Sequence, residues 1–153
     1  MALAMIQASA SLGDADQKEF LDVHNKARAA VGVPPITWNA TLEAYAKAYA
    51  AKRAADCALE HSHGPYAENI LQGPAEFPAA LATKTWVDEK AYYDYKSNSC
   101  TGGQECRHYK SVVCKNNKFI GCARIKCRND GGWFATCNYS PGYDPPPGNT
   151  VGD

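Results

Sequence analysis

The sequence predicts a single α+β domain that is held together by disulfide bonds. Helical periodicity and alanine-rich stretches occupy the chain up to about Glu89, whereas short runs of β-branched and aromatic residues follow Gly102-Gly103. Helices that precede an antiparallel sheet in the chain are typical of this fold class. Seven cysteines in 153 residues indicate an oxidising compartment, where disulfides between short strands persist.

Three helices are expected in the first part of the chain. Apolar residues recur at helical spacing from Asp16 to Val31, which predicts an amphipathic helix. A second helix is expected from about Thr41 to Cys57, because alanine, the strongest helix former, is densest there. A third helix is expected to begin near Phe77, since Pro78 suits a first helical turn.

The second part of the chain predicts an antiparallel meander. Its turns are expected at residues 115–118 and 129–132, which are rich in Asn, Asp, Gly and Lys. The preceding segment from His61 to Pro74 holds two Gly-Pro pairs and predicts a loop. The three strands of the expected meander are Tyr109–Lys115, Phe119–Lys126 and Trp133–Tyr139.

Charge and hydropathy exclude two classes of protein. Sixteen basic and sixteen acidic residues give zero formal net charge, which argues against a nucleic-acid binder. No apolar stretch reaches the roughly 18 residues that a transmembrane segment needs. Between Thr101 and Arg128, however, seven basic residues stand against Glu105 alone. This local excess predicts either a solvated face or attraction to an anionic lipid or cell-wall polymer.

The two ends of the chain are expected to lie outside the domain. Residues 1–10 are uncharged and end in Ala8-Ser9-Ala10, which resembles the end of a secretory leader cleaved after Ala10, although an ordinary frayed terminus would look similar. The residues from Pro141 onward are rich in Pro and Gly. We therefore divide the chain into a leader remnant (1–10), a domain (11–140) and an irregular C-terminal tail (141–153).

The sequence contains two Asn-X-Ser/Thr motifs and a pair of polar residues one helical turn apart, His24 and Arg28. Asn39-Ala40-Thr41 and Asn138-Tyr139-Ser140 match the acceptor pattern for N-glycosylation. Such patterns are common by chance, Asn39 is equally suited to cap a helix, and Asn138 is expected at a strand end. His24 and Arg28 are one helical turn apart, and we expect them to be buried structural partners rather than a site.

A series of short motifs is spread along the chain from roughly Asp16 to Tyr139. They are His24-Asn25-x-x-Arg28, Ile36-x-Trp38-x-x-x-Leu42, His61-Ser62, Tyr66-Ala67-Glu68-Asn69-Ile70, Trp86-Val87-x-Glu89-Lys90, Cys106-Arg107-His108-Tyr109, Gly121-Cys122-Ala123 and Cys137-Asn138-Tyr139. Together these motifs resemble the CAP superfamily with its SCP domain, and within it the plant pathogenesis-related proteins of family one.

The resemblance implies a three-layer α-β-α sandwich with an antiparallel sheet and a surface cleft. It also implies that His61, Glu68, Glu89 and His108 line the cleft. Two imidazoles and two carboxylates form a ligand set that suits zinc or another divalent metal, bound weakly and not as a required cofactor. The alternatives are a hydrogen-bonded polar cluster without metal, or a hydrolytic centre. No activated nucleophile accompanies the four residues in the motifs, since Ser62 is merely adjacent in sequence to His61.

The resemblance further implies a pairing of six cysteines. The pairs are Cys57–Cys127, Cys100–Cys106 and Cys122–Cys137, and each would restrict the unfolded chain. Cys114 is then left as a thiol, at a position where the family usually has Trp. The chain also departs from the family pattern at Ala67, where Gly is usual, and in its altered tail.

The function implied by the resemblance is that of a secreted, extracellular (apoplastic) defence protein without enzymatic activity. An antimicrobial or antifungal role would follow from binding a sterol or another membrane lipid of microbes, with Tyr92, Tyr93 and Tyr95 as candidate lining of an apolar groove. Two other functions stay open: a metal-dependent hydrolase that uses the His/Glu quartet, and a precursor of a C-terminal defence-signalling peptide. We expect a monomer in each case.

Overall fold

The computed structural model describes residues 2–141, and for residues 2–12 only the backbone. The helices are α1 (Ala2–Ala30), α2 (Ala40–Arg53), α3 (Ala79–Val87) and α4 (Arg107–Val113), and the 3₁₀ helix η1 (Asp88–Tyr92) follows α3 directly. The strands are β1 (Thr37–Trp38), β2 (Ala67–Gly73), β3 (Tyr93–Asp94), β4 (Ser99–Cys100), β5 (Phe119–Lys126) and β6 (Trp133–Ser140). Except for Pro141, the tail expected at 141–153 lies outside the described residues.

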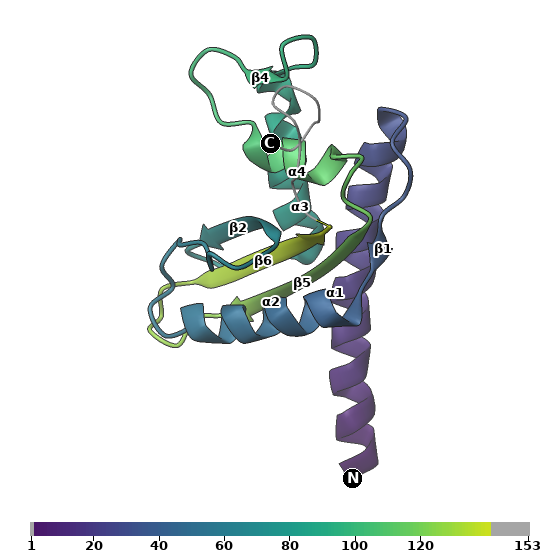
Figure 1. The fold of residues 1–153 in the computed structure, drawn as a ribbon. Coiled ribbons are helices and arrows are strands. Elements are labelled where there is room, and N and C mark those ends of the chain that lie inside the picture. Colours follow the sequence, from purple (N-terminus) through teal and green to yellow (C-terminus); the bar gives the residue numbers. More distant parts are fainter. Residues whose placement is uncertain (1, 142–153) are drawn as a thin grey trace.

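The elements form three layers, which confirms the predicted α+β class and sandwich. Helix α2 packs along one face of the sheet against β5 and β6, while α1, α3 and α4 pack against one another on the opposite side (Figure 1). A segment with β3 and β4 stands clear of the sheet beside α3 and α4 (Figure 1).

The main sheet has the strand order β1-β5-β6-β2. Strands β5 and β6 are antiparallel over their full length, and β2 pairs antiparallel with the other edge of β6. Two strands of the expected meander, Phe119–Lys126 and Trp133–Tyr139, are therefore confirmed as β5 and β6. The two-residue strand β1 is parallel to β5, so the sheet is not purely antiparallel.

The segment Tyr109–Lys115, which we expected to be a strand, is mostly helical. Tyr109, Val112 and Val113 have helical spacing, and all three lie in the core on the side that packs against α1 and α3. Periodicity does not distinguish a short apolar run in a strand from one in a helix. Tertiary packing therefore decides this element.

Part of the segment expected to be a loop is a strand. Residues 61–66 have no regular structure, but β2 begins at Ala67 and pairs with β6 up to Gly73. Its sequence has only two large apolar residues, Ile70 and Leu71, so the alternation typical of a strand is weak. This segment is a strand because its backbone pairs with β6. Three further strands, β1, β3 and β4, have two residues each, which is too short for a sequence pattern.

Helix ends also differ from the expected positions. Helix α1 begins at Ala2 rather than near Asp16, and α2 ends at Arg53 rather than at Cys57. Asn39 caps α2, since its side chain accepts a hydrogen bond from the Leu42 amide. The third helix begins one residue after Pro78, and Glu89 lies in η1.

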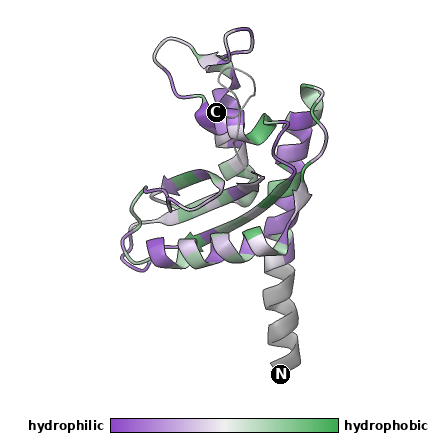
Figure 2. Cartoon of the chain, in the orientation of Figure 1, coloured by the Kyte–Doolittle hydropathy of each residue, from purple (hydrophilic) through white to green (hydrophobic). Residues whose placement is uncertain are grey.

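The core consists of two clusters, one on each side of the sheet. The larger lies between the sheet and the α1/α3/α4 layer and includes Phe20, Trp86 and Tyr139, whereas the smaller lies under α2 and includes Tyr49 and Phe134. Figure 2 shows apolar residues gathered along the strands between the helices. The α2 backbone approaches β5 so closely that a Cβ at Gly121 would lie 2.0 Å from the amide nitrogen of Glu43. Only glycine fits there.

Three disulfides join the same pairs that the resemblance implies. Cys57–Cys127 connects the end of α2 to the β5–β6 turn, Cys122–Cys137 crosses from β5 to β6, and Cys100–Cys106 closes a short loop before α4. Cys114 is buried and takes no part in a disulfide. Within the described range, no helix combines the length and the apolar character needed to cross a bilayer.

Candidate functional site

His61 and Glu68 form one hydrogen-bonded pair at the edge of the sheet. Nδ1 of His61 lies 2.9 Å from Oε1 of Glu68, whose side chain is only 5% exposed. The backbone amide of Ser62 donates to the same oxygen at 2.9 Å, and the Ser62 hydroxyl donates to Oε2 at 2.7 Å. Tyr45 of α2 donates in turn to Ser62 Oγ at 2.8 Å. Glu68 therefore orders the irregular segment 61–66 against α2.

Ser62 is not arranged as a nucleophile. Its hydroxyl hydrogen is directed to Glu68, and its oxygen accepts from Tyr45, while His61 also turns Nδ1 toward Glu68. A serine nucleophile needs a hydrogen bond to a base that can take its proton, and an imidazole commonly serves as that base. The adjacency of His61 and Ser62 in sequence does not produce that pair.

Glu89 and His108 form a second pair. Nδ1 of His108 lies 2.7 Å from Oε2 of Glu89, and the other carboxylate oxygen accepts the backbone amides of His108 at 3.0 Å and Tyr109 at 3.1 Å. The indole of Trp86 stacks on the His108 ring, with centroids 6.4 Å apart and an interplanar angle of 14°. Glu89 thus fixes the first turn of α4 to η1.

The two pairs lie on different sides of the edge strand β2. Side chains alternate along a strand, and Ile70 packs under α2 together with Phe134, so Glu68 faces α2 as well. Asn69 faces the opposite layer and donates to the backbone oxygen of His108 at 3.0 Å. The four predicted residues therefore form two separate hydrogen-bonded pairs.

A different set of three residues is more tightly grouped. Among residues 2–141, ligand atoms of Glu89, Glu105 and His108 lie within 4.8 Å of one another, and this is the one such group of three or more His, Cys, Asp or Glu. Glu105 is already held by Arg107 through bonds of 2.8 and 3.0 Å from the guanidinium and 2.8 Å from the backbone amide. These hydrogen bonds lower the pKa of Glu105 to about 2. A metal at this group would compete with Arg107.

The two histidines retain donor atoms for a metal. A carboxylate accepts but does not donate, so in each neutral ring the hydrogen lies on Nδ1 and the lone pair on Nε2. Histidines that bind metals are commonly oriented by a carboxylate in this way. In His61 the orienting carboxylate is Glu68, and in His108 it is Glu89.

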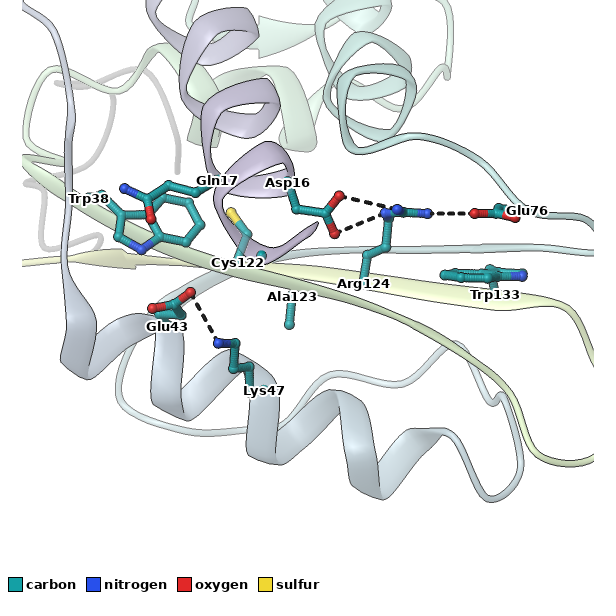
Figure 3. A pocket seen from close by; sticks show the side chains of 11 residues that line it. Asp16, Gln17, Trp38, Glu43, Lys47, Glu76, Cys122, Ala123, Arg124 and Trp133 are labelled. Atoms are coloured by element: carbon teal, nitrogen blue, oxygen red, sulfur yellow. Dashed lines mark hydrogen bonds and ion pairs between the residues drawn. The ribbon is translucent and has the colours of Figure 1, made fainter. Parts of the chain in front are cut away.

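A pocket of about 390 Å³ lies elsewhere, between α1, α2 and the free side of β5 (Figure 3). Arg124 of β5 is bound there by Asp16 through two contacts of 3.1 Å and by Glu76 at 3.3 Å, and its guanidinium lies 4.9 Å from the ring centroid of Trp133. None of the four predicted site residues lines this pocket. The sequence did not single out Arg124 except as part of the basic excess.

The other charged pair in the pocket lies on α2. Lys47 contacts Glu43 at 3.3 Å, and Trp38 lies opposite (Figure 3). Nε1 of Trp38 is buried and has no hydrogen-bond partner among the described residues. The described ion pairs thus join the charged side chains of the pocket to one another.

Three of the seven residues in the basic excess between residues 101 and 128 are bound by other groups of the fold. Arg124 is paired with Asp16 and Glu76, Arg107 with Glu105, and Lys110 is buried with its ammonium donating to the backbone oxygen of Asn98 at 3.2 Å.

The three candidate tyrosines lie in the segment that stands clear of the sheet. Tyr95 is 78% exposed and Tyr92 is 42% exposed. Tyr93 donates from its hydroxyl to Asn98 at 2.9 Å and contacts the ring of Tyr109. None of the three lines the pocket of Figure 3.

Both the sequence and the fold have relatives among known proteins. The family model described as the cysteine-rich secretory protein family, CAP, matches residues 21–139. Pathogenesis-related protein 1B of Nicotiana tabacum is 50% identical over 151 residues, which cover 98% of this chain and 86% of that protein. Pathogenesis-related protein 1A of the same plant is 51% identical over 138 residues, which cover 90% and 79%.

A solved structure supports the fold. The crystal structure of Na-ASP-1 superposes with a TM-score of 0.75 at 24% sequence identity. The match covers 90% of this chain and 41% of that chain, so the likeness concerns the domain fold alone.

Proposed function

Because the chain belongs to the cysteine-rich secretory protein (CAP) family, among the plant pathogenesis-related proteins 1, we propose that it is a secreted plant defence protein that acts on microbes in the apoplast. The observation that carries this proposal is the 50% identity to a tobacco pathogenesis-related protein over 98% of the chain. The three disulfides support an extracellular location, since disulfides persist under oxidising conditions.

The protein acts on microbial membranes by binding a sterol or another membrane lipid. The exposed rings of Tyr92 and Tyr95 support this mode of action, because tyrosine is favoured where an apolar surface meets water. Lys90 and Lys96 flank the two tyrosines in sequence, but Asp94 lies between them, so the support comes from the rings and not from net charge. It acts as a monomer.

The proposed role is not enzymatic and needs no cofactor. The hydrogen bonding of Ser62 to Glu68 and Tyr45 supports this, since it leaves the hydroxyl without an imidazole base. A divalent cation would be held weakly by His61 and His108. Bound there, it would supply a cross-link between the segment before β2 and the start of α4.

A vesicle experiment tests the lipid part of the proposal. We expect the protein to co-sediment with phosphatidylcholine vesicles that contain ergosterol and to do so much less with vesicles lacking it. The double variant Tyr92→Ser/Tyr95→Ser should lose most of this binding. Leu59→Ser removes an apolar side chain that is 61% exposed outside this segment and should bind like wild type. Equal binding to both kinds of vesicle, or full binding by the double variant, would contradict the proposal.

A further inference from the structure

The two Asn-X-Ser/Thr sequons occupy very different places in the fold. Asn39-Ala40-Thr41 joins β1 to α2 at the edge of the molecule, whereas Asn138-Tyr139-Ser140 lies inside β6. An N-linked glycan is bulky and hydrated, so it is compatible with a folded domain only at the surface. The structure therefore separates two motifs that the sequence alone leaves equivalent.

Asn138 has no room for a glycan. Its side chain is 0% exposed, and neither of its amide atoms has a hydrogen-bond partner within residues 2–141. Its neighbour across the β5–β6 pair is Gly121, the position where even one added carbon would collide with the α2 backbone at Glu43. A sugar on Asn138 would force α2 away from the sheet.

Asn39 has the opposite surroundings. It is partly exposed, and both Ala40 and Thr41, which complete the sequon, are exposed. The side-chain oxygen Oδ1 accepts a 3.0 Å hydrogen bond from the Leu42 amide at the start of α2. The nitrogen Nδ2 donates to no group in the described part of the chain and is not among its buried, unpartnered atoms. This atom is therefore not fully buried.

A glycan would be attached to Nδ2 of Asn39, whereas the hydrogen bond that caps α2 is made by Oδ1. The Asn39 amide nitrogen would form a bond to the anomeric carbon of an oligosaccharide carried on a lipid diphosphate. The bond from that carbon to the diphosphate oxygen breaks, the lipid diphosphate leaves, and Nδ2 gives up one proton to solvent. Oδ1 keeps its lone pairs, so the cap on α2 is retained in the product.

We propose that Asn39 is an N-glycosylation site of this protein and that Asn138 is not. This inference rests on the proposed function in one respect, because the modification requires passage through the secretory route. The glycan would stand at the N-terminus of α2, beside the end of the pocket that Trp38 and Glu43 line.

The test is secretion from a eukaryotic host with the host's own leader fused upstream of the chain. Entry into the secretory route then does not depend on residues 1–10, so the result is independent of where the natural protein is located. The intact mass and gel mobility of the secreted protein are measured before and after digestion with peptide N-glycosidase F. We expect one glycan per chain, removed by the enzyme.

Matched variants assign the glycan to its residue. Thr41→Ala removes the first sequon while leaving Asn39 as the helix cap, and it should abolish the mobility shift, whereas Thr41→Ser should retain it. Ser140→Ala removes the second sequon without touching buried Asn138 and should leave the shift unchanged. A wild-type protein insensitive to the enzyme, or a shift that is lost in Ser140→Ala and kept in Thr41→Ala, would overturn the proposal.

Discussion

The hydroxyl of Tyr139 donates a hydrogen bond of 2.8 Å to Nε2 of His24, and so joins the first helix to the last strand of the sheet. Nδ1 of the same ring lies 2.8 Å from the backbone oxygen of Phe20, which can only accept, so Nδ1 carries the hydrogen and Nε2 accepts. Asn69 of β2 donates to the Tyr139 hydroxyl at 3.1 Å and thereby extends the network to the other edge of the sheet.

This arrangement requires a neutral imidazole. Burial, together with the nearby positive charge of Arg28, lowers the pKa of His24 to about 4, while the hydrogen bond to Phe20 opposes this change. His24 and Arg28 are both buried, as expected from the sequence, but each bonds to other groups and the described contacts include no hydrogen bond between them.

Stability should fall as the solution becomes acidic. In the unfolded chain His24 takes up a proton near pH ~6.5, whereas in the folded protein it does so only near its lowered pKa of about 4. The stabilisation from neutral His24 is therefore complete above pH ~6.5. As the pH falls toward the folded-state pKa of about 4, the free energy of unfolding should decrease by about 3 kcal/mol. Urea unfolding with the disulfides intact, at pH ~7 and pH ~4, measures this.

The control for this prediction is His24→Gln, which cannot titrate. The variant should be less stable at neutral pH, but its free energy of unfolding should decline less on acidification than that of wild type. Equal declines in the two proteins would show that His24 is not the group responsible.

Arg28 should not be replaceable by lysine. The residue is 1% exposed, and its guanidinium donates to four backbone oxygens, at 2.8 Å to Pro34, 3.0 Å to Val112, 2.9 Å to Cys114 and 2.9 Å to Asn117. A lysine ammonium cannot reach all four, and each buried carbonyl without a donor costs about 1 kcal/mol or more. We expect Arg28→Lys to lower the free energy of unfolding by about 2–4 kcal/mol.

Arg107→Lys is the matched comparison for Arg28. The Arg107 side chain is 74% exposed and pairs with Glu105 at the surface, so its replacement should cost less than about 1 kcal/mol. Similar losses in the two variants, measured by chemical denaturation, would refute the role assigned to Arg28.

Cys114 should react only when the protein unfolds. It is buried, and the other six cysteines are joined in disulfides. Alkylation without reductant should therefore modify no thiol in the native protein and one thiol in denaturant, and Cys114→Ser should remove that one. Intact mass spectrometry gives the count. Three modified thiols in denaturant, or a mapped disulfide to Cys114, would be incompatible with this assignment.

Zinc affinity should depend on the two histidines rather than on Glu105. Calorimetry should show weak zinc binding, and the affinity should fall about tenfold or more in His61→Ala or His108→Ala. Replacing Glu68 or Glu89 by Gln should lower the affinity by a similar factor, because these carboxylates orient the rings. Glu105→Gln should bind as wild type does. If Glu105→Gln abolishes binding and His61→Ala does not affect it, the cation is held instead by Glu89, Glu105 and His108.

Much of the architecture could be predicted because strong local patterns carry it. The alanine-rich helix α2 and the strands β5 and β6 appear close to their expected positions, since long periodic segments have one favourable conformation. The segment Tyr109–Lys115 was expected to be a strand, but most of it belongs to the helix α4, and β2 was expected to be part of a loop. In both cases the sequence pattern is short, and contacts with distant elements decide the outcome.

The candidate site shows the same division. The sequence singled out His61, Glu68, Glu89 and His108, but the structure arranges them as two pairs on either side of β2. It also places Glu105 beside Glu89, which is 16 positions earlier in the chain, and beside His108. Side-chain grouping of this kind depends on how separate segments dock, which no local spacing encodes.

What the sequence by itself determined is the α+β class, the family, and the residues with the chemistry for a polar site. Only the tertiary structure decided which sequon is accessible and which carboxylate forms a hydrogen bond with which histidine. It also decided that His24 is neutral. The physical reason is the range of the interactions. Helical periodicity and turn preferences act between residues a few positions apart, whereas burial and hydrogen bonds join residues such as His24 and Tyr139, which are 115 positions apart.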